Sequence, residues 1–197
     1  DDAATVRMIT LKILAKLSQF NPLYISSITR GTVLDYFFIL RQKSNIRQKA
    51  RIASILPDLI NASASAVPTY SEVFLGILIQ SFQDHHSAKF SNFIEEYANT
   101  KILIGLADSL RTLAPYDPEQ VWKHLDIIVH EFCEFLFPNE DRLLISSILK
   151  AFLVLLTPPC SCLEIRTKVP TILSACSNLL ANTRSRSIRK SILRVMG

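Results

Sequence analysis

The residues best suited to metal chemistry are four histidines and four cysteines. His85 and His86 are adjacent in sequence, and adjacent residues rarely converge on one metal ion without further ligands. His124 and His130 are six positions apart. That spacing places them on different faces of a helix, unlike the i, i+4 pair of a helical zinc site. We therefore interpret the histidines as surface or packing residues.

The cysteines do not predict a metal site either. Cys160 and Cys162 share a short loop that follows two prolines, but a structural zinc site needs two more ligands. The remaining thiols, Cys133 and Cys176, lie on apolar helical faces, where free cysteine behaves as a small hydrophobic residue. The sequence predicts no metal ligand and no cofactor.

Catalytic motifs give no candidate nucleophile. The sequence contains no GxSxG, Walker A, Rossmann glycine, HRD or DFG pattern, which are the motifs of several large enzyme classes. Paired carboxylates such as Glu95 with Glu96, and Glu131 with Glu134, fall on polar faces, as acidic residues on solvated helices normally do. We expect no catalytic residue in this chain.

Two clusters of basic residues remain as candidate binding surfaces. The first comprises Arg41, Lys43, Arg47, Lys49 and Arg51, and the second comprises Arg184, Arg186, Arg189, Lys190 and Arg194. Both mix helix faces, so they could line a groove that attracts phosphates. Charge runs at the ends of solenoid helices are usually solvated, however, and we favour that interpretation over nucleic-acid contact. From the second cluster we predict a partner-contact surface made of Arg184, Arg186, Arg189 and Lys190.

Composition predicts a folded, soluble, intracellular protein. The chain has 197 residues, of which 49% are hydrophobic and 20% charged, and a net charge of +5. Enough apolar surface is present to offset chain entropy, and the mild basicity permits acidic partners without requiring them. The N-terminus does not resemble a signal peptide. The longest apolar stretch, 143–156, contains Lys150 and is too short to span a bilayer.

Helical periodicity, interrupted by proline, runs along the whole chain. Apolar residues recur at i, i+3, i+4 and i+7, and prolines separate the periodic runs, which is typical of successive amphipathic helices. We predict four helix pairs and a last single helix: 3–19 with 22–42, 44–63 with 69–83, 99–114 with 118–136, 140–156 with 168–182, and a helix from about 185.

The spacing of these helices predicts an all-α fold, an α-solenoid of HEAT-type hairpins. The first helix of each pair begins near 3, 44, 99, 140 and 185, a spacing of roughly 40 to 55 residues that is close to the HEAT and armadillo period. The longest interval suggests an insertion at about 84–98, with a short amphipathic turn at Phe90, Phe93, Ile94 and Tyr97. We interpret 1–197 as one segment of a larger solenoid.

The last helix supports that interpretation. Ile188, Ile192, Leu193 and Val195 have no following helix in this sequence to cover them, whereas a complete solenoid ends in a repeat with a polar outer face. We therefore expect the chain to be an excerpt from a longer array.

Three stretches resemble the N-terminal HEAT region of the TOR protein kinases, which are phosphatidylinositol-3-kinase-related kinases. They are residues 14–24 (LAKLSQFNPLY), residues 169–173 (VPTIL) with 178–180 (NLL), and residues 188–197 (IRKSILRVMG). The last is similar to the run that leads into G-A-L-D-P-Y in TOR proteins. The region from about 63 to 99 departs from the family pattern.

The resemblance implies a scaffold role. The parent chain would carry a distant serine/threonine kinase domain, and this segment would shape a solenoid that docks a Raptor-like subunit and supports dimeric assembly. Such a complex would be cytoplasmic and would associate peripherally with endomembranes. No catalytic residue transfers, because the family has none in this region.

Two alternatives remain open from the sequence. One is a HEAT scaffold of another class, such as a nuclear transport receptor or a phosphatase scaffold subunit. The other is a HEAT-like DNA glycosylase, suggested by the net charge and the single Trp122; such an enzyme would bind DNA with a steep salt dependence.

Overall fold

A computed structural model describes residues 22–42, 45–87, 92–137, 141–161 and 163–197, together with the isolated positions 6, 9, 10, 13, 16, 17 and 20. These residues contain helices and no strand, so the predicted all-helical class is confirmed. The elements are α2 (Pro22–Arg41), α3 (Ile46–Ala62), the 3-10 helix η1 (Ala64–Thr69), α4 (Ser71–Ser87), α5 (Phe93–Leu113), α6 (Pro118–Lys123), α7 (Leu125–Leu136), α8 (Arg142–Leu155), α9 (Leu163–Asn182) and α10 (Arg186–Met196). The predicted helix at 3–19 lies mostly outside the described residues.

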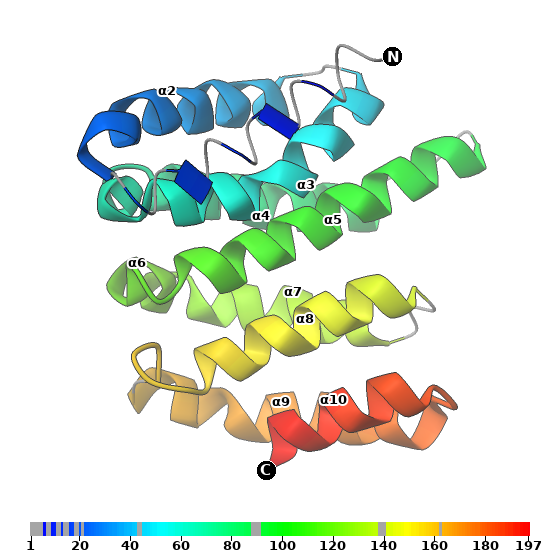
Figure 1. The fold of residues 1–197 in the computed structure, drawn as a ribbon. Coiled ribbons are helices and arrows are strands. Elements are labelled where there is room, and N and C mark those ends of the chain that lie inside the picture. The colour runs from blue at the N-terminus through cyan, green and yellow to red at the C-terminus, as the bar shows by residue number, and fades with distance from the viewer. Residues whose placement is uncertain are drawn as a thin grey trace.

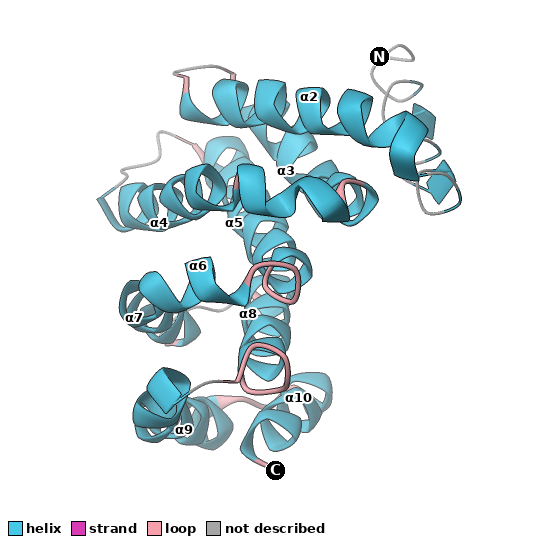
Figure 2. Ribbon diagram, turned by 90° about the vertical axis from the view of Figure 1, so that its left-hand side faces the viewer, coloured by secondary structure: helices cyan, strands magenta, loops and turns pink. Residues whose placement is uncertain are grey.

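The helices stack in two rows that follow chain order. In one row α3, α5, α8 and α10 pack successively against one another, and in the other α2, α4, α7 and α9 do the same. Figure 1 shows the chain descending from α2 to α10, and Figure 2 shows the two rows side by side. Apart from 3–19, the helices predicted to come first in each pair occupy the first row, and the predicted second helices occupy the other.

Polar caps begin the helices of the first row. The side chains of Asn45, Asn92, Asp141 and Ser185 each accept a hydrogen bond from a backbone N–H of the following turn. Such caps satisfy donors that have no partner within the helix. The residue directly before each of α3, α5, α8 and α10 therefore determines where that helix starts.

The predicted helix at 118–136 is broken in two. Asp117 caps α6, but the backbone of His124 (φ −109°, ψ 6°) leaves helical geometry, and α7 starts at Leu125. Val121 and Leu125 are both buried on either side of the break. Periodicity alone missed it because the apolar stripe continues through the break.

Helix covers much of the predicted insertion at 84–98. Helix α4 extends to Ser87, and α5 begins at Phe93 rather than near 99. Position Phe90 lies outside the described residues. Phe93, Ile94 and Tyr97 form the first turns of α5 and are 77%, 55% and 51% exposed. The expected short amphipathic turn is thus the start of a long helix, because Asn92 caps it and nothing breaks helical geometry after that cap.

Aromatic side chains join the rows in the middle of the stack. The ring of Phe82 on α4 lies 5.0 Å from that of Phe132 and 4.9 Å from that of Phe135, both on α7, and the Phe132 ring lies 5.7 Å from Phe152 on α8. All four side chains are at most 4% exposed. Burial of such large side chains is among the largest contributions to core stability.

Two small residues set the close approach of α3 to α5. A Cβ atom placed on Gly105 would lie 2.4 Å from the carbonyl oxygen of Ala53. Ala53 precedes Pro57 by four residues within α3, and proline has no N–H to donate to that carbonyl. Glycine at this position therefore allows α5 to pack directly on the backbone of α3.

The last helix is better covered than its sequence suggested. Ile188, Ile192 and Val195 are buried, because α10 packs against α8 and α9. Only Leu193 of the four predicted apolar residues is exposed, at 59%, with Met196 beside it on the helix at 39%. Preceding helices thus bury three of these four apolar residues.

Candidate partner-binding surfaces

The four predicted contact residues come from a link and from the helix that follows it. Arg184 lies in the link between α9 and α10, whereas Arg186, Arg189 and Lys190 are on α10, and all four side chains are exposed. At 100° per residue, Arg186 and Lys190 lie on the side of α10 opposite the buried Ile188 and Ile192, whereas Arg189 lies on the flank of the helix.

Arg184 contributes instead to a hollow that we name the basic groove. The hollow has a volume of about 450 Å³ and lies where the ends of α7 and α9 meet the starts of α8 and α10. Its charged lining consists of Arg142 and Arg184, and its polar lining consists of Asn182, Thr183 and Ser185. Its apolar lining consists of Leu136, Phe137, Ile145, Leu179 and Ile188.

Two caps position the arginines of the basic groove. The carboxylate of Asp141 accepts hydrogen bonds from the N–H groups of Leu143 and Leu144, both at 2.9 Å, which fixes Arg142 as the first residue of α8. The hydroxyl of Ser185 caps α10 directly after Arg184. Sequence reasoning missed Arg142 because it is far from Arg184 in the chain and belongs to no basic cluster.

Positive charge predominates in the C-terminal part of the sequence, which supplies both arginines of the basic groove. After Asp141 the sequence contains nine basic residues and a single acidic residue, Glu164. Within the described part of the chain, neither Arg142 nor Arg184 forms an ion pair. The basic groove therefore presents two guanidinium groups that are available to an anionic partner.

The first basic cluster is divided by the fold. Arg41 and Lys49 line a second hollow of about 480 Å³ between α2, α3, α4 and α5, whereas Arg47 and Arg51 are exposed and do not line it. Lys43 lies outside the described residues. The second hollow is also lined by acidic residues, so the cluster does not create a uniformly basic surface.

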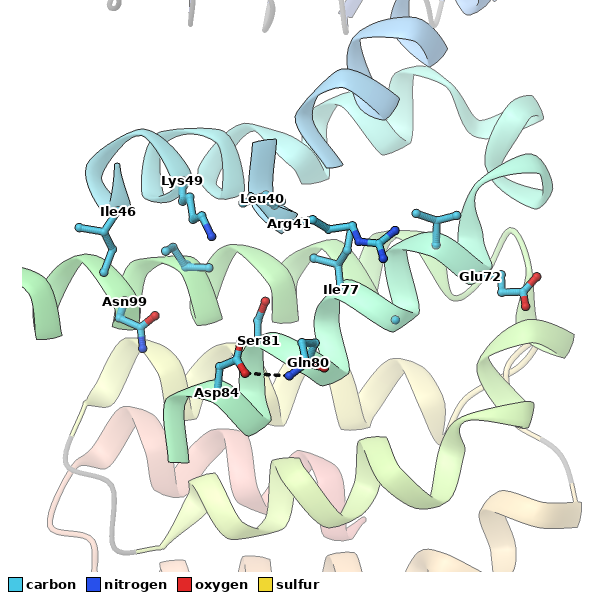
Figure 3. Close-up of a pocket in the computed structure, with 13 residues that line it drawn as sticks. Leu40, Arg41, Ile46, Lys49, Glu72, Ile77, Gln80, Ser81, Asp84 and Asn99 are labelled. Carbon is cyan, nitrogen blue, oxygen red and sulfur yellow. Dashed lines mark hydrogen bonds between the residues drawn. The ribbon is translucent and has the colours of Figure 1, made fainter. Parts of the chain in front are cut away.

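Figure 3 shows this second hollow, which we name the mixed groove. Glu72 and Asp84 of α4 line it opposite Arg41 and Lys49, and the Gln80 side-chain amide donates to Asp84 at 2.7 Å. Burial lowers the pKa of Lys49, and the nearby Asp84 carboxylate partly offsets that effect. Both charge signs line the hollow, so it favours no single class of charged ligand.

Helices α7 and α9 are joined by an ion pair, and each of them also carries a cysteine. Lys168 lies 2.6 Å from Asp126, and Cys133 lines a shallow hollow between the same helices. Burial raises the pKa of both Cys133 and Cys176 to about 11. Thiols with such raised pKa values are poor nucleophiles at neutral pH.

The histidines belong to α4, to α7 and to the break before α7. His85 and His86 belong to α4, His124 sits at the break between α6 and α7, and His130 is exposed on α7. Cys160 is buried, and Cys162 lies outside the described residues. In the part of the chain that the structure describes, no group of three His, Cys, Asp or Glu side chains is placed to hold a metal ion.

Comparison with known proteins gives one match of interest. The chain is 26% identical over 105 residues to the serine/threonine-protein kinase TOR2 of Saccharomyces cerevisiae. The match covers 53% of this chain and 4% of TOR2, so the chain spans only a small part of that kinase. No family model matches the chain. The resemblance to TOR kinases is thus supported over about half of the sequence.

The described helices include none that is both long enough and apolar enough to cross a bilayer.

Proposed function

We propose that this chain is a non-catalytic HEAT-repeat scaffold segment of a TOR-like serine/threonine kinase. The observation that carries the proposal is the two-row stack, in which the successive helices of each row pack against one another. Repeat proteins of the solenoid type are built in this way, and they use extended surfaces to bind other proteins.

The similarity to TOR2 supports placing this scaffold in a TOR-like parent. A protein kinase domain includes strands that carry its Gly-rich loop and catalytic lysine, whereas the described residues of this chain are helical. In the proposed parent, the kinase domain lies outside these residues. The segment supports assembly of the kinase complex in the cytoplasm, with peripheral association with endomembranes.

Docking of a Raptor-like subunit is the specific partner role that we propose. Exposed aromatic side chains support a docking role, since aromatic residues are enriched at the energetic centres of interfaces. Phe93 and Tyr97 stack at 6.2 Å on the first turns of α5, and the Lys101 ammonium lies 4.5 Å from the Tyr97 ring centroid. This exposed stack extends beyond the packed core.

Co-purification tests the proposal. The tagged chain, alone and extended by the flanking helices of its own gene, is mixed with a purified Raptor-like subunit of the same organism. We expect retention by the extended chain and much weaker retention by the 197-residue chain, because a docking surface on a solenoid spans several helix pairs. Failure of both chains to retain the subunit would refute docking, and ATP hydrolysis by either would refute the non-catalytic role.

A matched pair of variants sharpens this test. Replacing Phe93 and Tyr97 together by serine should weaken retention of the Raptor-like subunit, because it removes the proposed aromatic contact. The variant should still fold, since both side chains are exposed and their removal costs little core packing. The control is Leu163→Ser, which removes a side chain that is 74% exposed on α9. Equal loss in both variants would contradict a docking role for the aromatic stack.

The DNA glycosylase alternative receives no support from Trp122. Its indole Nε1 donates a hydrogen bond to the backbone carbonyl of Cys160 at 2.9 Å, and the side chain is only partly exposed. An indole held in this way joins α6 to the loop after α8. We assign it a structural role.

A further inference from the structure

We propose that the basic groove binds an acidic segment of a partner protein, with one apolar side chain of that segment seated between Arg142 and Arg184. This inference rests on the proposed scaffold function and names the chemistry of one of its partners. It concerns the groove formed by the ends of α7 and α9 and the starts of α8 and α10.

The charge of the groove selects an anionic partner. Arg142 and Arg184 both line it, both are exposed, and within the described residues neither is engaged in an ion pair. Asp141, the nearest acidic residue in sequence, is already committed to capping α8 through two backbone N–H groups. Guanidinium groups bind carboxylates through paired hydrogen bonds, which adds directional specificity to charge attraction.

The floor of the groove selects an apolar side chain. Leu136, Ile145, Leu179 and Ile188 line it and belong to the buried core, whereas Phe137 at its edge is 53% exposed. A hollow of about 450 Å³ has room for one large side chain. Aromatic and aliphatic anchors that enter such pockets dominate the energetics of protein interfaces.

The same geometry disfavours other anionic macromolecules. A nucleic acid presents a regular line of phosphates, and neutralising it requires a track of basic residues. Among the described residues, two arginines line the groove, and Arg186, Arg189 and Lys190 of α10 do not line it. An anionic membrane is a broad surface, and the apolar floor here lies in a concavity between helix pairs.

Fluorescence anisotropy with a defined probe tests the inference. The probe is a short fluorescein-labelled peptide in which glutamates and aspartates flank one phenylalanine, and a second probe has serine in place of that phenylalanine. We expect saturable binding of the first peptide and clearly weaker binding of the second. Single-stranded oligonucleotides and phosphatidylserine vesicles serve as the competing anionic ligands, and tighter binding of either would overturn the assignment.

Variants separate the groove from diffuse positive charge. Arg142→Glu and Arg184→Glu should each weaken peptide binding by about tenfold, the usual effect of losing a charged hydrogen bond. The control is Arg189→Glu, which makes the same change in net charge on an exposed residue of α10 that does not line the groove. It should change affinity by less than about threefold, because surface charges away from a site are screened.

The variants are expected to fold, since the altered side chains are exposed and an acidic residue suits the first turn of α8; circular dichroism verifies this. Equal weakening by all three variants would overturn the inference, as would equal binding of the two peptides. Either result would leave the scaffold proposal in place, because that proposal is tested separately by retention of the Raptor-like subunit.

Discussion

The contact between Gly105 and Ala53 leads us to predict that Gly105→Ala lowers the free energy of unfolding. Replacing a helical glycine by alanine normally stabilises a protein, because alanine is favoured in helices by about 1 kcal/mol. At Gly105 the added Cβ would lie 2.4 Å from the oxygen, 2.5 Å from the carbonyl carbon and 2.8 Å from the Cβ of Ala53. Two of these atoms belong to backbone, so no side-chain rotation can relieve the clash.

The magnitude follows from the distance. Ordinary van der Waals contact begins near 3.4 Å, so α3 and α5 must separate locally by about 1 Å to admit the methyl group. Overpacking of this kind costs about 1–3 kcal/mol, and the backbone contact places Gly105→Ala in the upper part of that range. After subtracting the gain in helix propensity, we expect a net loss of about 1–2 kcal/mol.

Two other glycines provide matched controls. A Cβ added to Gly31 in α2 or to Gly76 in α4 would meet no atom within 4 Å. Gly31→Ala and Gly76→Ala should therefore stabilise the protein by up to about 1 kcal/mol. Because about 1 kcal/mol shifts Tm by roughly 2–4 °C in a chain of this size, the variants should move Tm in opposite directions.

Urea unfolding and thermal melting followed by circular dichroism measure the effect. The reasoning about α3 and α5 is refuted if Gly105→Ala is as stable as the parent chain or more stable. A loss of stability in Gly31→Ala would show instead that helical glycines in this fold are sensitive to any side chain.

Three further outcomes follow from the described contacts. Phe132→Ala should destabilise the protein by about 3–5 kcal/mol, because its ring contacts Phe82 and Phe152 and is 1% exposed; a urea midpoint close to that of the parent chain would contradict it. Asp117→Ala should cost about 2 kcal/mol in urea unfolding, since this carboxylate caps α6 and also accepts from the Ser71 hydroxyl. Asp141→Ala, which removes the cap of α8, should cost about 1 kcal/mol. Stability should fall as pH rises from about 9 to about 11, because the folded protein holds the protons of Cys133 and Cys176 up to a pKa of about 11 while the unfolded thiols ionise near 9.0. Urea midpoints measured across this pH range test the effect. If the midpoint of a Cys133→Ser, Cys176→Ala double variant falls with pH as steeply as that of the parent chain, the thiols are not its cause.

Local sequence features were sufficient to predict most helices. The stripe Ile52, Ile55, Leu56, Leu59 and Ile60 is buried as its spacing indicated, and helix α8 begins within two residues of the predicted position. Both features depend on neighbours three or four residues apart or on a cap directly before the helix. The break at His124 was missed because a change of backbone angle can leave an apolar stripe unbroken.

The candidate binding surface could be predicted only in part. Sequence identified Arg184 as a basic residue near a helix start, but it grouped Arg184 with Arg186, Arg189 and Lys190, which do not line the groove. It could not identify Arg142, whose place beside Arg184 depends on the packing of α8 against α10.

What the sequence determined by itself is the set of amphipathic helices and the order in which they follow one another, because hydrophobic period, caps and prolines act over a few residues. The tertiary structure decided which faces meet. It placed Gly105 on the backbone of Ala53, buried three apolar residues of α10, and assembled the basic groove from two separate helix pairs. Those contacts join residues tens of positions apart, and their geometry depends on how whole helices cross.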